Sequence, residues 1–292
     1  MFSKKLLIPL LSLSLLVTPA YSSHAAENAE AAGTSVEGQG MLSPSSSSES
    51  SESVFNGSGA GTSSEPVTDE KLETILKQVQ SQLPAENGTW AVFISDLVNG
   101  TEGSLNDQKM QAASLIKLYI MGAVYENYDQ ITGQYGKDSV DSNLYSMITV
   151  SDNDAANTLT TYLGGGDSAA GMQAVNSFCQ AHGYDQTHMG RMLLASNEND
   201  DNYTSVGDCG HLLQEIYKQD TSGYTHAADM FNLLKAQTRC NKIPAQLPEG
   251  VKTANKTGEL DNVENDAGII YDTAKGKDLV ICFMSQNLND TA

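Results

Sequence analysis

Apolar positions in the second quarter of the chain follow first a helical period and then a strand period. Apolar residues recur every three to four positions from Leu72 to Val79, after the good N-cap residue Thr68, which predicts a helix over 68–83. Residues 89–105 are rich in β-branched and aromatic residues on both sides of an Asn-Gly pair at 99–100. This pattern predicts a hairpin of two strands.

The rest of the chain is helical in its middle and extended at its end. Helical patterns occupy residues 112–126, 144–162, 169–182, 207–219 and 226–238, and strands are predicted at 251–260, 265–272 and 278–285, with a turn at Gly276 between the last two. Strands near both ends predict an α+β fold. One antiparallel sheet, flanked by helices and built from 67–112 and 248–292, would carry residues 113–247 as an inserted all-helical subdomain. A groove between the two parts is the expected place for a site.

The first 66 residues differ in composition from a packed domain. Residues 1–25 place Lys4 and Lys5 before a short apolar run and several small residues, which is the layout of a signal peptide. We therefore expect a secreted or cell-surface protein without a membrane-spanning segment in its mature chain; the alternative is an uncleaved anchor. Residues 26–66 are rich in Ser, Gly and Glu, and we expect a disordered tether because they offer little apolar surface to bury.

Charge and cysteine content narrow the classes of partner. The formal net charge of −20 disfavours nucleic acid and anionic membranes as partners. In an exported protein the four cysteines could form two disulfides, in pairings that the sequence does not separate; they are Cys179, Cys209, Cys240 and Cys282. No Cys-x-x-Cys pair occurs and the five histidines are scattered, so neither a metal nor another cofactor is expected. The oligomeric state stays open.

One lysine lies within the most apolar helix of the chain. Lys117 belongs to "AASLIKLYIMGAVYE", residues 112–126, where an unpaired charge would be costly. Ser114 precedes it by three positions and shares its helix face, so the two side chains can meet. A desolvated lysine with a lowered pKa could act as the base that a serine nucleophile needs. The alternative is a lysine whose stem crosses the core while its amine reaches water.

Two further short motifs follow. Ser-Asp-Asn at 151–153 opens a helical segment, where the serine and aspartate could simply be caps. Lys-Thr-Gly at 256–258 lies on a strand that leads into a turn, where the lysine could merely protect a sheet edge. Each motif has an ordinary explanation. Ser-x-x-Lys, Ser-Asp-Asn and Lys-Thr-Gly in this order, on helix, helix start and strand, are hard to assign to chance.

This set resembles the signature of class A β-lactamases and penicillin-binding proteins. The resemblance runs from about residue 68 to the end, and it extends to residues 147–165, 247–260 and 267–271. It implies a β-lactamase/transpeptidase-like fold. It also implies a serine hydrolase that forms an acyl-enzyme with a β-lactam or a small substrate like a peptidoglycan stem.

The resemblance also implies roles for individual residues. Its catalytic group comprises the nucleophile Ser114, its base Lys117, the proton relay Ser151 and the positively charged Lys256. Its substrate-binding group comprises Asn153 for the substrate amide, Thr257 for a carboxylate, and the close-approach residue Gly258. The backbone N–H groups of Ser114 and Glu259 would form the oxyanion hole.

The resemblance breaks at the residue expected to activate water. In "RMLLASN", residues 191–197, Arg191 and Asn197 keep the family's spacing, but Leu193 replaces the glutamate of class A β-lactamases. A leucine cannot accept a proton, so we expect acylation followed by slow deacylation. The nearby acids that could substitute are Glu198, Asp200 and Asp201. Arg191 itself is expected to bridge an acid of its own loop.

A second departure concerns the substrate-binding arginine that many members carry on the strand after Lys-Thr-Gly. Ala267 occupies that position, and Arg239 is a possible replacement unless it is only a helix-end cation. Three functions remain open. The chain could be a β-lactamase-like hydrolase acting through a Ser114 acyl-enzyme, a D-Ala-D-Ala peptidase acting on peptidoglycan, or a surface module that binds or senses β-lactams without turnover.

Overall fold

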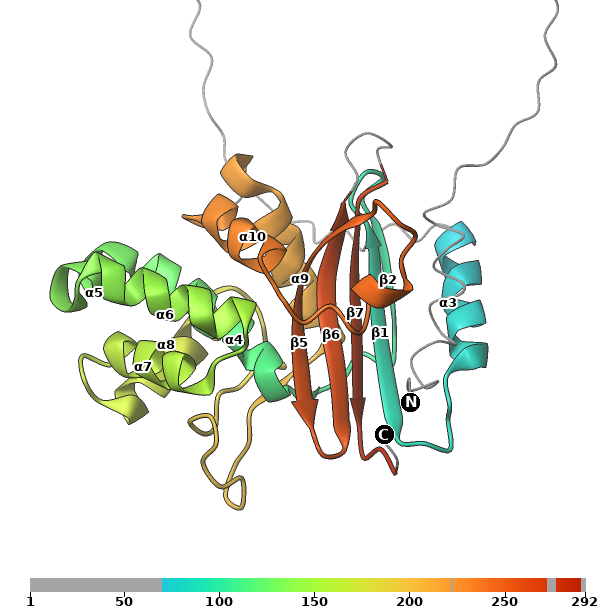
Figure 1. The fold of residues 1–292 in the computed structure, drawn as a ribbon. Coiled ribbons are helices and arrows are strands. Elements are labelled where there is room, and N and C mark those ends of the chain that lie inside the picture. The colour runs from blue at the N-terminus through green and yellow to red at the C-terminus, as the bar shows by residue number, and fades with distance from the viewer. Residues whose placement is uncertain (1–69, 222, 272–276, 290–292) are drawn as a thin grey trace, which may run out of the picture. The chain divides into compact units, whose positions relative to one another are not determined.

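A computed structural model describes residues 70–221, 223–271 and 277–289 (Figure 1). The segments interpreted above as a signal peptide (1–25) and a tether (26–66) lie outside the described residues, as does the turn at Gly276. Within the described ranges, no helix has both the length and the apolar character that crossing a bilayer requires.

Five strands from the two ends of the domain form one antiparallel sheet, in the order β2-β1-β7-β6-β5. They are β1 (Thr89–Asp96), β2 (Thr101–Leu105), β5 (Lys252–Leu260), β6 (Val263–Tyr271) and β7 (Leu279–Gln286). β1 pairs along its whole length with β7, with Phe93 opposite Cys282. The strand that comes first along the chain, β1, therefore lies next to the strand that comes last, β7. This arrangement confirms the predicted α+β fold.

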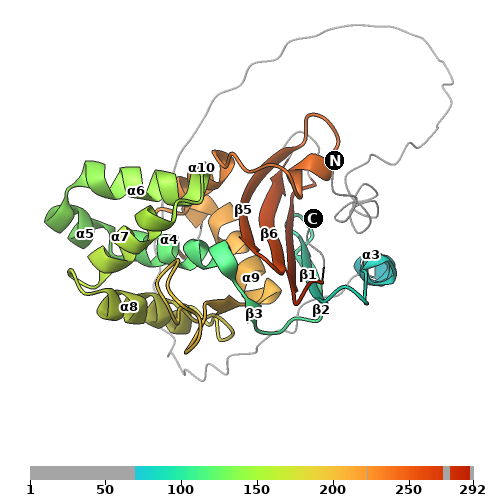
Figure 2. The same ribbon diagram turned by 60° about the horizontal axis from the view of Figure 1, so that its bottom comes forward.

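The helices between these strands lie mostly to one side of the sheet (Figures 1 and 2). They are α4 (Ile116–Glu126), α5 (Tyr128–Tyr135), α6 (Lys137–Thr149), α7 (Asn153–Leu163), α8 (Ser168–Ala181), α9 (Val206–Tyr217) and α10 (Ala227–Lys235). The single helix predicted over 144–162 is in fact α6 and α7, because the backbone turns at Ser151, whose φ is 62°. α5 was not predicted; its one buried residue is Ile131, so it has no apolar periodicity.

Short elements complete the described part of the chain. The 3₁₀ turns are η1 (Ala113–Leu115), η2 (Gln219–Thr221) and η3 (Pro244–Gln246), and the short strands are β3 (Met110–Gln111) and β4 (Tyr203–Thr204). β3 pairs with β4, and the backbone N–H of Ala112 donates to the carbonyl oxygen of Asn202 at 2.9 Å. These bonds fix the end of the loop after α8 beside the start of α4.

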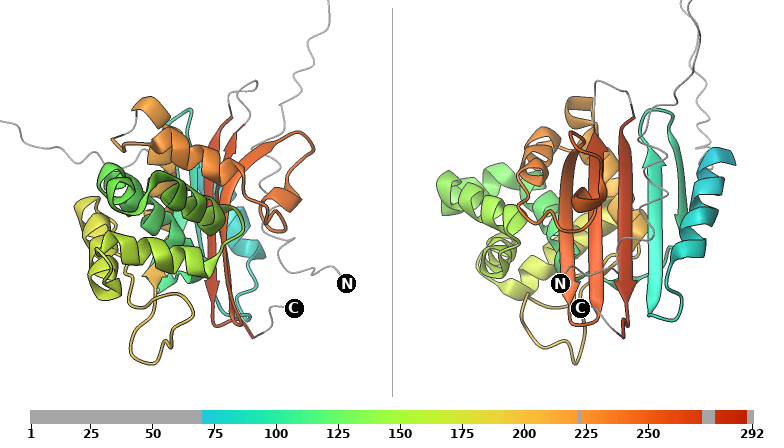
Figure 3. Two further views of the ribbon diagram at one scale, coloured as in Figure 1. Left: turned by 60° about the vertical axis from the view of Figure 1, so that its left-hand side comes forward. Right: turned by 45° about the vertical axis from the view of Figure 1, so that its right-hand side comes forward.

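Strand alternation sends the side chains of β7 into two apolar cores. Val280, Cys282 and Met284 join the larger core with the helices, whereas Leu279, Ile281 and Phe283 join a second core. Helix α3 (Glu70–Gln82) lies beside β1 and β2 (Figure 3) and contributes to the second core. Its buried residues are Leu72, Ile75, Leu76 and Val79, as the helical spacing predicted.

The cysteines do not form the disulfides that the sequence allowed. All four are free thiols, and Cys179, Cys209 and Cys282 are buried in the larger core. Buried cysteine behaves as a small apolar side chain. Burial raises the pKa of the Cys209 thiol to about 12, so Cys209 is uncharged at neutral pH and acts as a packing residue.

The close contact between α7 and α8 gives a stability prediction. A Cβ on Gly171 would lie 1.8 Å from the carbonyl oxygen of Thr160. Gly171→Ala should therefore force the helices apart and lower the free energy of unfolding by about 1–3 kcal/mol. The melting temperature should fall by about 2–4 °C per kcal/mol.

Gly133→Ala is the matched control. It lies on α5, and a Cβ there would meet nothing within 4 Å, so it should stabilise the helix by up to about 1 kcal/mol. Thermal unfolding followed by circular dichroism measures both variants. Equal melting temperatures would contradict the packing described for Gly171.

Candidate active site

The serine of the first motif lies where the chain enters α4. Ser114 is the middle residue of η1 and is half-buried, and Figure 2 shows the start of α4 beside β5. The residue before it, Ala113, has a φ of 47°, in the left-handed region that non-glycine residues rarely occupy. Such backbone strain is typical of sites where the fold must aim a side chain.

Lys117 is fully buried in the first turn of α4, so its amine does not reach water as the alternative interpretation required. Its Nζ donates to the carbonyl oxygen of Ser151 at 2.6 Å and to Oδ1 of Asn153 at 2.7 Å. It also lies 3.2 Å from the hydroxyl oxygens of Ser114 and Ser151. A neutral amine has two N–H groups for the two carbonyl-type oxygens, and its lone pair remains available for a serine hydroxyl.

The surroundings of Lys117 also change its acidity. Burial lowers the pKa of Lys117 to about 8; the negative charge of Asp152 opposes this shift, and the positive charge of Arg239 adds to it. At pH 7 about one molecule in ten would carry the neutral amine. Lys117 therefore has both the position and the pKa of a general base for Ser114.

Lys256 approaches the same group of atoms from the sheet. It lies on β5, the last strand in the order of the described sheet, yet its side chain is completely buried, so protection of an exposed edge does not explain it. Its Nζ donates to Oγ of Ser151 at 2.8 Å and to the carbonyl oxygen of Thr257 at 2.7 Å. Burial, together with the charge of Lys117, lowers the pKa of Lys256. The Ser151 hydroxyl therefore lies between two amines.

The remaining members of the Ser-Asp-Asn and Lys-Thr-Gly motifs lie around the row of side chains formed by Ser114, Lys117, Ser151 and Lys256. Asp152 is the N-cap of α7 and accepts from the backbone N–H of Ala155 at 2.8 Å, as the capping interpretation expected. Thr257 is buried on β5. A Cβ on Gly258 would lie 3.1 Å from the backbone nitrogen of Ser114, so glycine keeps the strand close to that N–H group.

Arg239 lies beside the last residue of the predicted site. It follows α10 by four positions, so it is not a helix-end cation. Its Nη1 is 3.6 Å from Oε2 of Glu259, and it is about half exposed. The structure places Arg239 at the end of Lys-Thr-Gly, and its role as a substrate-binding residue stays a prediction.

Lys242 is a member of this region that sequence reasoning missed. Its Nζ lies 3.1 Å from Oε1 of Glu259 and 2.6 Å from Oε2 of Glu264, and the side chain is 5% exposed. Glu259 and Glu264 are directly opposite each other in the β5–β6 pair, where two like charges repel. Lys242 offsets that repulsion. The symmetric spacing of the two glutamates about the turn was the available signal.

The loop in which the resemblance would place a water-activating glutamate carries Leu193 instead. Leu193 is buried in the larger core. Its backbone N–H donates to Oδ1 of Asn157 at 2.8 Å, and Nδ2 of Asn157 donates back to its carbonyl oxygen at 3.0 Å. This pair of bonds ties the loop to α7. That residue 193 corresponds to the family's glutamate stays a prediction from the sequence resemblance.

The nearby acids are engaged elsewhere or exposed. Asp201 accepts from Nε of Arg191 at 2.7 Å, which is the loop-internal ion pair expected for this arginine. Asp200 pairs with the imidazole of His188 at 2.7 Å, and Glu198 is exposed. Among the described residues, no three His, Cys, Asp or Glu side chains are grouped as a metal site.

Comparison with known proteins gives the family. A model of the Beta-lactamase enzyme family matches residues 71–137 and 132–292, which together span the described part of the chain. The chain belongs to this family. A search of curated proteins found no match.

Solved structures agree with this assignment. Penicillin-binding protein PBP-A is 24% identical with a TM-score of 0.64, over 77% of this chain and 91% of that chain. An ancestral class A β-lactamase (GNCA) is 21% identical with a TM-score of 0.63, over 74% and 92%. A leucine-to-glutamate variant of PBP-A, solved as an acyl-enzyme complex with penicillin G, is 23% identical with a TM-score of 0.64, over 78% and 92%. Family and fold together support a serine hydrolase of this superfamily.

The charges around Lys117 give a prediction with opposite signs for two variants. The Asp152 carboxylate favours the protonated amine, so Asp152→Asn should lower the pKa of Lys117; asparagine is also an N-cap, so α7 is preserved. The Arg239 cation disfavours the protonated amine, so Arg239→Gln should raise that pKa. Titration of the Lys117 Nζ nitrogen by NMR measures both. Shifts of the same sign would contradict the described arrangement.

Proposed function

We propose that this protein is a serine hydrolase that opens a β-lactam, or a related peptide amide, through an acyl-enzyme on Ser114 and releases the acyl group slowly. The observation that carries the proposal is the row Ser114, Lys117, Ser151 and Lys256, joined by contacts of 2.8–3.2 Å, beside a buried Leu193. The row supplies the groups that acylation needs. The leucine withholds the group that deacylation needs.

Acylation follows from these positions. Neutral Lys117 accepts the proton of the Ser114 hydroxyl as its oxygen attacks the carbonyl carbon. Ser151, 3.2 Å from the Lys117 amine, passes its proton to the nitrogen of the breaking C–N bond and receives from Lys117 the proton taken from Ser114, while Lys256 donates a hydrogen bond to the Ser151 oxygen. The carbonyl oxygen, which becomes negative, would be bound by the backbone N–H groups of Ser114 and Glu259.

Deacylation requires a base that takes a proton from water. Leu193 cannot serve, and Asp201 is already paired with Arg191 inside the loop. A PBP-A variant in which a leucine is replaced by glutamate was solved as an acyl-enzyme complex with penicillin G, which supports acylation by a β-lactam in this fold. Slow release is the behaviour of a penicillin-binding protein more than of an efficient β-lactamase.

The same residues are compatible with two further functions. Cleavage of a D-Ala-D-Ala peptide uses the same four residues, with the β-lactam as a mimic that remains attached. We propose this peptidase reaction as the second candidate, and a sensing module that is acylated once as the third. The proposed location is outside the cytoplasm, on the basis of the signal-peptide layout of residues 1–25.

The proposed role of Lys117 gives a prediction about the pH dependence of acylation. Covalent labelling by a fluorescent penicillin should be about tenfold faster at pH 9 than at pH 7, because Lys117 becomes an active base above a pKa of about 8. Lys117→Ala should slow labelling by about 10²–10⁴-fold and remove this rise. Ser114→Ala should abolish labelling, and labelling that survives would remove Ser114 as the nucleophile.

The second prediction concerns release. Leu193→Glu should shorten the lifetime of the acyl-enzyme, by up to about 10²–10⁴-fold if the carboxylate reaches the hydrolytic water. Leu194→Glu is the control, since Leu194 is 76% exposed and should leave the lifetime unchanged. Loss of label with time measures both. Equal lifetimes in the two variants would contradict the position given to residue 193.

A further inference from the structure

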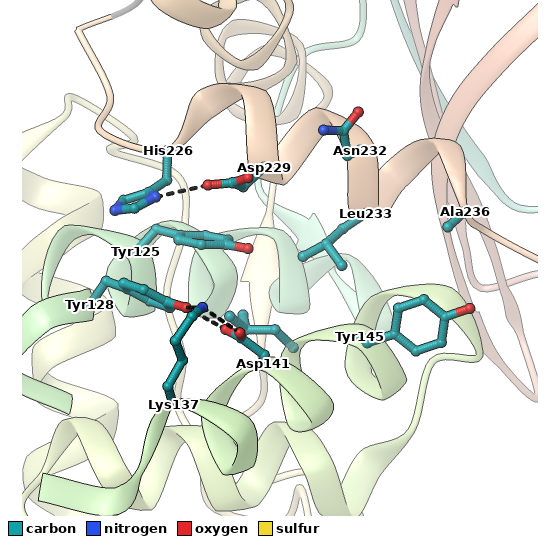
Figure 4. A pocket seen from close by; sticks show the side chains of 11 residues that line it. Tyr125, Tyr128, Lys137, Asp141, Tyr145, His226, Asp229, Asn232, Leu233 and Ala236 are labelled. Carbon is teal, nitrogen blue, oxygen red and sulfur yellow. Dashed lines mark hydrogen bonds and ion pairs between the residues drawn. The ribbon is translucent and has the colours of Figure 1, made fainter. Parts of the chain in front are cut away.

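A cavity lies in the helical part of the chain, between α6 and α10 and the end of α4 (Figure 4). Its volume is about 430 Å³, and none of the four residues of the catalytic row lines it. Its walls are an apolar surface that includes Leu233 and a set of aromatic, acidic and amide side chains. The cavity is large enough for a small organic ligand.

Tyr125 presents its hydroxyl to this cavity. The residue is 7% exposed, and Figure 4 shows its hydroxyl pointing into the space between α6 and α10. Among the described residues the hydroxyl has no hydrogen-bond partner. Burial and the nearby carboxylates of Asp229 and Asp141 raise the pKa of Tyr125, so the group stays a neutral phenol that can accept or donate a hydrogen bond.

Two polar side chains of α10 line the cavity as well. Asp229 and Asn232 are three residues apart, so they share a helix face, and both line the cavity. Asp229 accepts through Oδ2 from the imidazole of His226 at 2.8 Å, which leaves its other oxygen for a ligand. The Asn232 amide has no hydrogen-bond partner within the described ranges. Together with Tyr125 they offer three acceptor oxygens.

On the other side of the cavity, a phenol and a carboxylate hold the ammonium group of a lysine side chain. The Lys137 ammonium lies 2.6 Å from Oδ2 of Asp141 and 2.7 Å from the hydroxyl of Tyr128, and 5.2 Å from the centre of the Tyr128 ring. An aromatic ring, a phenol oxygen and a carboxylate therefore already hold one ammonium group. The Tyr125 ring itself stacks between Tyr128 and His226, so Tyr125 and Asp229 repeat only the phenol oxygen and the carboxylate, without a lysine between them.

The charge of the lining favours the same class of ligand. Asp141 and Asp229 carry two negative charges, and Lys137 carries one positive charge that Asp141 already neutralises. The carboxylate of Asp229 would repel an anion and attract a cation. The whole chain, with a net charge of −20, adds to this preference.

We infer that this cavity binds a primary ammonium group carried on a short apolar stem. The ammonium donates to the hydroxyl of Tyr125 and to Asp229, while the stem lies on Leu233. Two sources have this chemistry, namely a free alkylamine and the side chain of a lysine-like residue in a peptide. The inference does not depend on the proposed function, because it uses no residue of the catalytic row.

The test is a titration of the full chain at pH 7 with n-pentylammonium, with 1-pentanol as its neutral analogue and with Nα-acetyl-lysine amide as the peptide-like form. The readout is the NMR signal of the Asn232 side-chain amide. Pentylammonium should shift this signal, and 1-pentanol should not. Tighter binding of the lysine amide identifies a peptide side chain as the source, and tighter binding of pentylammonium identifies a free amine.

Variants make the test specific. Tyr125→Phe keeps the packed ring and removes one hydrogen bond to the ammonium, and Asp229→Asn keeps the shape of the side chain and removes its negative charge; each should weaken ammonium binding about tenfold. Asp138→Asn removes the same charge from α6 outside the cavity and should change affinity by less than about twofold. Thermal unfolding checks that each variant folds.

Two results would overturn the inference. One is equal shifts from pentylammonium and 1-pentanol, which would mean that only the apolar stem is recognised. The other is an affinity for pentylammonium that folded Tyr125→Phe and Asp229→Asn leave unchanged, which would place the amine elsewhere.

Discussion

The buried amine of Lys117 is the constraint on which the candidate active site depends. An amine inside an apolar helix is costly unless acceptors surround it. Those acceptors are the carbonyl oxygen of Ser151 and the side chain of Asn153, both at the junction of α6 and α7. The helical insertion must therefore dock this junction against the first turn of α4. Lys256 reaches the same junction from β5, so helix, junction and sheet are joined at Ser151.

The backbone near the site carries the strain that this joining requires. Ala113 and Ser151 both have positive φ values, 47° and 62°, although neither is glycine. Each such residue costs of the order of 1–3 kcal/mol, which packing elsewhere must offset. The two apolar cores on either side of β7 provide that packing. The strain lies at the residue before Ser114 and at Ser151, whose side chains both lie 3.2 Å from the Lys117 amine.

The sequence was sufficient for what depends on local periodicity and on short motifs. The apolar spacing of α3, the hairpin of β1 and β2 and the three terminal strands were predicted because each is buried on a regular face. The apolar sequence of α4 indicated that Lys117, if buried, would need hydrogen-bond acceptors around its amine or a lowered pKa. The motif spacing identified the residues that the fold brings together around Ser151.

Features that depend on tertiary position were not predictable in the same way. Helix α5 buries only Ile131 and so has no pattern to detect. The break at Ser151 is imposed by the site, against helical patterning on both sides. The thiols remained ambiguous because pairing depends on distances that spacing does not give. Lys242 became meaningful only when the β5–β6 register placed Glu259 opposite Glu264.

We expect acylation to be competent and release to be slow, because the buried Leu193 cannot accept a proton from water. The most direct measurement is the intact mass of the protein as a function of time after mixing with benzylpenicillin. The account predicts an adduct of one penicillin per chain that persists long after free penicillin is removed. An adduct that forms and disappears within seconds to minutes, or no adduct at all, would contradict it.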